Sequence, residues 1–126
     1  MPMRPLPSDG ELEILAVLWG RGPSTVRQVH GALPSGRDVS YNTVGKLLQI
    51  MTDKGLVAVD SSTRAHVYAA VEAEADVQGR LARDLMRRAF GGSAAQLALR
   101  ALSREACTPA ELGELRALLD ALEAEE

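Results

Sequence analysis

Glycine and proline residues interrupt the first half of the chain at short intervals and leave room there only for short helices. The breaks fall at Gly20, at Gly22-Pro23, at residues 33–36 and at Gly55. Between them, apolar residues recur every three or four positions, which is the spacing that places side chains on one face of a helix. Because proline and glycine cannot continue a helix cheaply, the pattern predicts three short helices in succession.

Residues that cap helices stand in front of these apolar stripes. Ser8 and Glu11 have the spacing of a capping box, in which each side chain satisfies a free amide at a helix start. Residues 24–25 and Ser40 are the next N-cap candidates. The third predicted helix therefore runs from Tyr41 to Lys54, and the glycine that follows is a typical helix-ending residue.

Two short apolar stretches follow the third predicted helix. They cover residues 56–59 and 66–71 and are separated by a polar tip at 60–65. In the second stretch, alternate apolar residues from Val67 to Val71 fall on one side, which predicts a β-hairpin. Three helices followed by a hairpin is the order of a winged helix-turn-helix. The sequence thus predicts a mostly α fold in which a β-hairpin wing follows three helices.

Three more helical stripes occupy the rest of the chain. The first has its apolar residues from Val77 onward, and the acidic stretch 72–76 either links to this helix or begins it; the other two helices are predicted to start after Ser93 and at Thr108. Three helices in about fifty residues bury too little surface to be stable alone, so we expect two copies to cover each other's stripes. The alternative is that these helices fold back on their own N-terminal domain. We predict a winged helix-turn-helix domain at 6–72 and a helical dimerisation domain at 73–126. The predicted dimerisation residues are Leu81, Leu85, Phe90, Leu97, Leu102, Leu112, Leu115, Leu119 and Leu122.

Composition limits the class of protein. Apolar residues make up 46% of the chain and aromatic residues only 3%, which favours packed helices over a large sandwich. No stretch approaches the roughly 18–20 apolar residues that span a membrane, and no apolar run of a secretory signal follows the start. Cys107 is the single cysteine, which excludes an internal disulfide and fits a reducing compartment. We therefore expect a cytoplasmic protein without membrane insertion.

Charge is distributed unevenly along the chain. The formal net charge is −3, yet between Arg21 and Tyr68 six basic residues face three acidic ones, a net of +3. The acidic residues gather near the two ends of the chain. For nucleic-acid binding, the distribution of charge over the surface matters more than the net charge. The middle of the chain can therefore form a basic face although the whole chain is acidic.

The third predicted helix has a polar side that suits the major groove of DNA. At about 100° per residue, Asn42, Lys46 and Gln49 fall opposite the apolar stripe. Amides can pair with adenine edges, and lysine can reach guanine or a phosphate, whereas Gly45 would let the helix approach the bases closely. Hydroxyls and amides at the helix start and side chains of the wing are expected to hold the DNA backbone. The predicted DNA-binding residues are Ser40, Tyr41, Asn42, Thr43, Gly45, Lys46, Gln49, Arg64 and His66. The alternative is an ordinary solvated helix face.

Several segments together resemble the penicillinase-repressor family, the BlaI/MecI/CopY group of bacterial transcriptional regulators. No single segment is diagnostic, but their order and spacing over residues 6–122 is specific. The segments that carry the resemblance are residues 12–19 (LEILAVLW), 25–30 (TVRQVH), 41–44 (YNTV), 54–57 (KGLV), 64–68 (RAHVY) and 90–93 (FGGS).

The resemblance implies a homodimer that binds a pseudo-palindromic operator in double-stranded DNA and represses resistance or stress genes. It also implies release by proteolysis, triggered by a membrane-bound sensor metalloprotease. The bond cleaved in the family, typically Asn-Phe, lies in the helix after the Gly-Gly pair, and the matching position here is Arg100-Ala101. Gly45 and Ile50 stand where relatives often place larger or basic residues, so the resemblance implies a different operator sequence.

No catalytic or metal-binding pattern is present in the sequence. His30 and His66 lie far apart, with no cysteine or glutamate at metal-ligand spacing. No nucleophile, base and orienting group are placed together, so we expect neither an enzyme nor a cofactor. The rival interpretation, from another class, is a dimeric winged-helix adaptor that binds proteins and has lost DNA binding.

Overall fold

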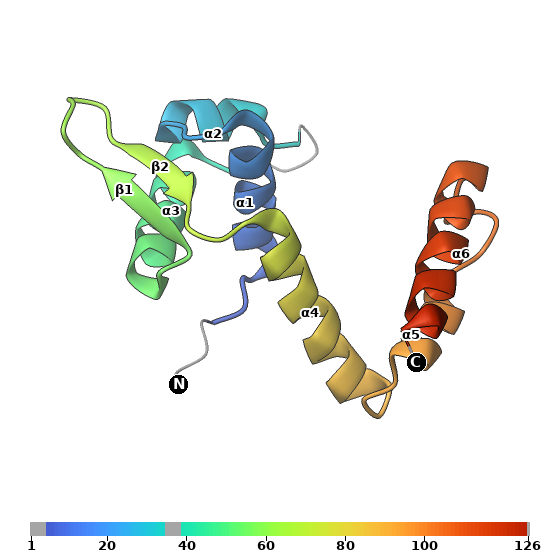
Figure 1. Cartoon of the computed structure of the whole chain (residues 1–126). Helices are drawn as coiled ribbons and strands as arrows, with labels where there is room; N and C mark the ends of the chain where they lie inside the picture. Colours follow the sequence, from blue (N-terminus) through green and yellow to red (C-terminus); the bar gives the residue numbers. More distant parts are fainter. Residues whose placement is uncertain (1–4, 35–38, 126) are drawn as a thin grey trace. The chain divides into compact units, whose positions relative to one another are not determined.

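The computed structural model describes residues 5–34 and 39–125, which form six helices and one hairpin within those ranges (Figure 1). The chain forms two compact units, Met1–Leu81 and Ala82–Glu126. The elements in chain order are α1 (Asp9–Arg21), α2 (Val26–Ala32), α3 (Tyr41–Lys54), β1 (Val57–Asp60), β2 (Val67–Ala70), α4 (Glu74–Ala89), α5 (Ala94–Ala101) and α6 (Pro109–Ala124).

The first two helices begin at capping boxes. At the start of α1, the Ser8 amide donates to Glu11 Oε1 over 2.8 Å and the Glu11 amide donates to Ser8 Oγ, as the sequence predicts. Thr25 and Gln28 exchange the same pair of bonds at the start of α2. Each box satisfies two amides that have no partner inside the helix, so both helix starts are fixed by residues within one turn.

The third helix has the bounds predicted from the sequence. Ser40 caps it by accepting a hydrogen bond from the Thr43 amide over 3.1 Å. It ends at Gly55, whose φ of 80° lies in the left-handed region that glycine adopts without a steric penalty. The side of α3 that carries Val44, Leu48 and Met51 is fully buried.

The hairpin pairs β1 with β2 in antiparallel register, from Val57 opposite Ala70 to Asp60 opposite Val67. Tyr68 also pairs with Ser24 in the loop before α2, through N–H···O bonds of 2.8 and 2.9 Å. This pairing turns the Tyr68 side chain into the core, whereas Val71 is exposed. Val67, Ala69 and Val71 share one side, as the alternating pattern predicts, and the core-facing side chain of β2 is Tyr68 from the other side.

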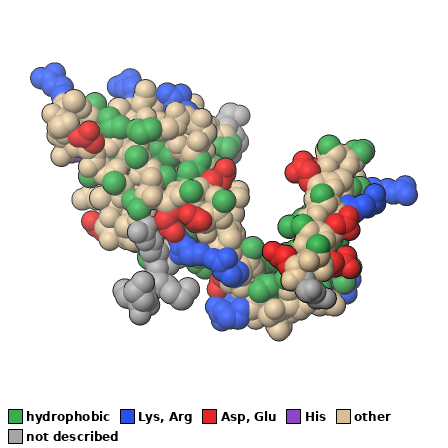
Figure 2. Space-filling view, in the orientation of Figure 1, with side chains coloured by type: hydrophobic (Ala, Val, Ile, Leu, Met, Phe, Trp, Pro, Cys, Tyr) green, Lys and Arg blue, Asp and Glu red, His purple; other side chains and the backbone are tan. Residues whose placement is uncertain are grey.

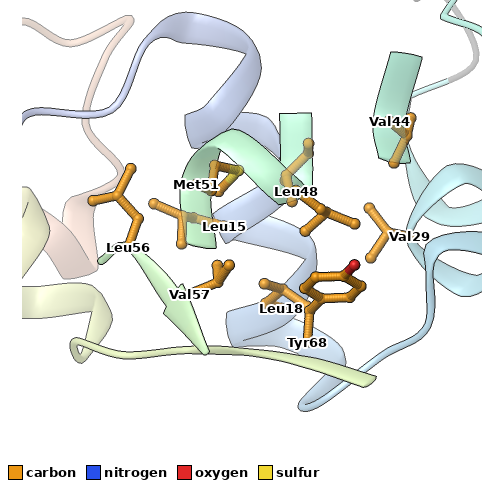
Figure 3. Packing of buried hydrophobic residues seen from close by; sticks show 10 residues of the cluster. Leu15, Leu18, Val29, Val44, Leu48, Met51, Leu56, Val57 and Tyr68 are labelled. Atoms are coloured by element: carbon orange, nitrogen blue, oxygen red, sulfur yellow. The ribbon is translucent and has the colours of Figure 1, made fainter. Parts of the chain in front are cut away.

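The core of the first unit lies where α1, α2, α3 and the hairpin meet. Figure 3 shows the Tyr68 ring among apolar side chains that come from these elements. The buried core residues are Ile14, Leu15, Leu18, Val29, Val44, Leu48, Met51, Leu56, Val57 and Tyr68. A core supplied by three helices and a hairpin holds α3 rigidly, and this positions its outer face.

The first unit continues into the beginning of α4. Trp19 Nε1 donates to the Glu72 carbonyl oxygen over 3.1 Å, Arg80 binds the Glu72 carboxylate over 2.7 Å, and Val77 is buried. These contacts place the division between the units after Leu81, later than the boundary predicted between residues 72 and 73.

The second unit contains the end of α4 together with α5 and α6. Ser93 and Thr108 cap α5 and α6 as predicted, and Pro109 occupies the first turn of α6. Neither α5 nor α6 has a buried residue. Within residues 5–34 and 39–125, we find no helix long and apolar enough to cross a lipid bilayer.

Candidate nucleic-acid interface

The outer face of α3 consists of polar side chains that no core residue covers. Asn42, Thr43, Lys46 and Gln49 are exposed, as the helix projection predicts. The buried stripe on the other side of α3 leaves this face turned away from the core. Amide, hydroxyl and ammonium groups on one rigid helix face form a set of donors and acceptors suited to base edges.

Side chains at the start of α3 make hydrogen bonds within the protein, and these bonds leave fewer of their polar groups free to bind DNA. Ser40 Oγ already caps the helix and lies 2.9 Å from Thr43 Oγ1, so the Ser40 hydroxyl is engaged within the protein. His30 Nε2 lies 2.8 Å from the Val39 carbonyl oxygen, and the His30 ring meets Tyr41 edge to face at 6.2 Å between centroids. His30 therefore fixes the entry into α3, and Tyr41 is left exposed beside the predicted contacts.

A groove of about 410 Å³ separates the wing from the start of α2. Arg64 and His66 line it from the hairpin, Tyr41 from α3, and Thr25 and Arg27 from the start of α2. The structure thus brings two arginines, one from the wing and one from α2, to the same groove. Arg64 and His66 were predicted from the sequence, whereas Arg27 and Thr25 were not, although a basic residue in the first turn of the helix before α3 could have indicated a contact.

A second groove, of about 360 Å³, lies between α3 and the hairpin. Gly45, Gln49 and Asp53 line it from α3, and His66 from the hairpin, so His66 belongs to both grooves. A Cβ built on Gly45 would lie 3.9 Å from Val26 Cγ1, an ordinary contact. Packing of the fold therefore does not require glycine at this position, and the missing side chain leaves the groove side of α3 open.

One of the basic residues counted in the sequence is not available to this face. Lys54 Nζ lies 2.9 and 3.1 Å from the two carboxylate oxygens of Glu11, which is 2% exposed. Burial of the Glu11 carboxyl acts to raise its pKa, but hydrogen bonds from the Ser8 amide and from Lys54 outweigh this and hold the pKa below its usual 4.5. The Lys54–Glu11 pair consequently fastens the end of α3 to the start of α1.

Three exposed cations of the first unit lie around the predicted contact face: Arg27 and Arg64 line the groove beside the wing, and Lys46 lies on the outer face of α3. In Figure 2, basic side chains project at the hairpin tip and over α2. Arg37 lies outside the described residues. Among the described residues, no three His, Cys, Asp or Glu side chains come together in a way that could hold a metal ion.

The residues predicted for dimerisation remain partly or fully accessible. Leu85, Leu102, Leu112, Leu119 and Leu122 are exposed, and Phe90, Leu97 and Leu115 are half-buried. Leu81 is half-buried and ends the first unit. The second unit therefore presents a largely uncovered set of apolar side chains.

The position that matches the family's cleaved bond lies at the end of a helix. Arg100 and Ala101 are the last two residues of α5, and both are exposed. Leu102 caps the helix in an extended conformation. The bond between Arg100 and Ala101 is thus at a helix end, where the chain opens more easily than in a helix interior.

Comparison with known proteins gives consistent matches over nearly the whole chain. The family model described as penicillinase repressor matches residues 7–121. The transcriptional regulator BlaI of Mycobacterium tuberculosis is 39% identical over 92 residues, which cover 72% of this chain and 67% of that protein. The penicillinase repressor of Staphylococcus aureus is 21% identical over 113 residues, 90% of each chain. The methicillin resistance regulatory protein MecI of Mammaliicoccus sciuri is 20% identical over 113 residues, 90% of this chain and 92% of that protein.

The matched region contains both the capped helices with the hairpin and most of the second unit. The family and the Staphylococcus aureus relative are described as penicillinase repressors and the Mycobacterium tuberculosis relative as a transcriptional regulator, which is a regulatory and not an enzymatic role. The chain belongs to the penicillinase repressor family.

Proposed function

We propose that the protein is a homodimeric repressor that binds a pseudo-palindromic operator in double-stranded DNA, with α3 in the major groove. The observation that carries this proposal is the exposed polar face of α3, with Asn42, Lys46 and Gln49 opposite a fully buried stripe. A rigid helix with this pattern can present its donors to base edges without further rearrangement.

The groove beside the wing supports a backbone contact in the same complex. Arg27 lines it from α2 and Arg64 from the hairpin, and Tyr41 at the start of α3 lines it as well. Arginine pairs readily with phosphate oxygens, and contacts of this kind fix the register of a protein on DNA without reading sequence. We therefore assign base contacts to α3 and phosphate contacts to the groove.

The uncovered leucines of the second unit support the proposed dimerisation. Leu118, Leu119 and Leu122 of α6 are all more than half exposed in the single chain. Contiguous exposed apolar side chains mark interaction sites, and a second copy offers a self-complementary set. Two copies would then place two α3 helices on two operator half-sites.

The regulated genes and the inducing signal are proposed by analogy with the named relatives. A penicillinase repressor and a methicillin resistance regulatory protein are among them, so we propose control of resistance or stress genes in the cytoplasm, where the chromosomal DNA lies. We also propose release by proteolysis near Arg100-Ala101, triggered by a membrane-bound sensor metalloprotease. Because these residues are unlike the family's usual Asn-Phe, the protease specificity would differ.

The test replaces Lys46 and compares affinity and salt dependence. Duplexes are first selected from a random-sequence pool with the full chain, and binding is then measured by fluorescence anisotropy at several salt concentrations. If Lys46 contacts a base, Lys46→Ala weakens binding to the selected duplex by about 1–3 kcal/mol per contact. If it contacts only phosphate, the loss is nearly independent of sequence and the salt slope becomes shallower.

Arg21→Ala is the matched control, since Arg21 is exposed at the end of α1 and lines neither groove beside the wing. It removes the same charge and should leave the affinity for the selected duplex nearly unchanged. Failure of the wild-type chain to select any duplex sequence would contradict the proposal and favour the protein-binding adaptor.

A further inference from the structure

Ile50 stands out on α3 because nothing in the first unit covers it. Its side chain is 46% exposed, whereas Val44, Leu48 and Met51 are fully buried and Leu47 is half-buried. It is not among the apolar residues that pack against the core, and it lines neither groove beside the wing. The fold of the first unit therefore gives Ile50 no packing partner.

The place of Ile50 on the helix puts it among the residues proposed to face DNA. It follows Lys46 by four residues, which is about one turn, so the two side chains are neighbours on the helix surface. On the side of α3 away from the hairpin groove, it extends the polar face formed by Asn42, Lys46 and Gln49. If this face lies in the major groove, Ile50 can make a favourable contact there only with an apolar group on a base edge.

We infer that Ile50 is a specificity-determining residue that reads the 5-methyl group of a thymine in each operator half-site. In the major groove of DNA, the thymine methyl is the apolar feature that distinguishes one base edge from another. Contact between this methyl and the exposed Ile50 side chain removes both from water, which favours thymine over cytosine or uracil at that position. The inference rests on the proposed function, since it requires α3 to lie in the major groove.

The test removes one methyl group from the DNA and leaves the protein unchanged. In a duplex selected by the wild-type chain, each thymine is replaced in turn by uracil, which keeps every hydrogen-bonding group. Loss of one buried methyl contact should weaken binding about fourfold, and loss in both half-sites about 15-fold. The loss of affinity that depends on Ile50 should occur at only one pair of thymines, one in each half-site.

A double-mutant cycle connects the sensitive thymine to Ile50. Ile50→Ala should bind the thymine duplex more weakly and should lose its preference for thymine over uracil at that one pair, whereas Ile50→Val should keep part of the preference. Val71→Ala is the matched control, because Val71 is 44% exposed but follows the hairpin rather than lying on α3. It should keep the full thymine preference. Urea unfolding followed by the fluorescence of Trp19 checks that the variants remain folded.

Two outcomes overturn the inference while the proposed function stands. In the first, the wild-type chain binds its selected duplex but no uracil replacement changes affinity. In the second, Ile50→Ala keeps the full preference for thymine over uracil. A change in the mass of this variant in sedimentation, with the thymine preference intact, would belong to the same outcome. Absence of sequence-specific binding by the wild-type chain would instead defeat the proposed function itself.

Discussion

Helices α3 and α6 are similar in length and capping, yet they differ completely in burial. They contain 14 and 16 residues, and a side-chain hydroxyl caps each at its start. Helix α3 buries three apolar side chains in the core of its own unit, whereas α6 buries none. Both helices have an apolar stripe. The stripe alone therefore does not determine whether a helix is buried against other elements of the same chain.

The difference follows from what surrounds each helix. Around α3, two other helices and a hairpin supply side chains on several sides. The second unit offers only α5 and the end of α4, and small units of this kind leave most of their surface in contact with water. We conclude that α3 is positioned by its own chain, while α6 is left with a face that a second chain can cover.

The largest expected effect contrasts the same substitution in the two helices. Leu48→Ala should lower the free energy of unfolding of the first unit by about 2–5 kcal/mol, because it leaves a cavity in a closed core. Leu119→Ala, at a position 59% exposed, should change that free energy by less than about 0.5 kcal/mol. Urea unfolding followed by Trp19 fluorescence measures both, since Trp19 is the single tryptophan and lies in α1. Equal effects would mean that α6 packs on the core of the first unit, which is the alternative in which the C-terminal helices fold back on their own N-terminal domain.

The next prediction asks what covers α6. Leu119→Asp should convert the proposed dimer to a monomer in sedimentation equilibrium. It should also weaken binding to the selected duplex about 100-fold or more, because the second half-site is no longer bound by a linked subunit. Ala117→Asp places the same charge on the opposite side of α6 and should leave the mass and the affinity nearly unchanged. A dimer that survives Leu119→Asp would show that the partner surface lies elsewhere.

The smallest effect tests how α3 is fastened within the first unit. Because the pKa of Glu11 is lower in the folded protein than its usual 4.5, the carboxylate contributes stability that is fully present above this value and is lost as the pH falls through the folded-state pKa. The denaturant midpoint in urea should therefore decrease as the pH is lowered below the usual 4.5 of this carboxyl.

Glu11→Gln should flatten this pH dependence and lower the stability at neutral pH, because Lys54 then loses its carboxylate partner. Glu74→Gln, at an exposed position in the first turn of α4, is the control and should keep the dependence of the wild type. If the urea midpoint of Glu11→Gln depends on pH as it does in the wild type, the Lys54–Glu11 pair is not the cause of the dependence.

Local features predicted much of this molecule. The capping boxes at Ser8 and Thr108, the bounds of α3 and the left-handed Gly55 all follow from interactions between residues within a turn of one another. The exposed polar face of α3 was likewise predictable from the sequence, because the regular geometry of a helix determines which residues share a side. The order of elements then favoured a winged helix, and the family comparison supports it.

What the sequence alone determined, then, is where the helices begin and end and which face of each is apolar, since these depend on neighbours along the chain. The tertiary structure decided which partners those faces meet. It turned Tyr68 inward by pairing it with Ser24, brought Arg27 to the groove of Arg64, and withdrew Lys54 from the basic face by binding it to Glu11. Each of these contacts joins residues far apart in the sequence, and local spacing contains no information about which distant residues will be brought together.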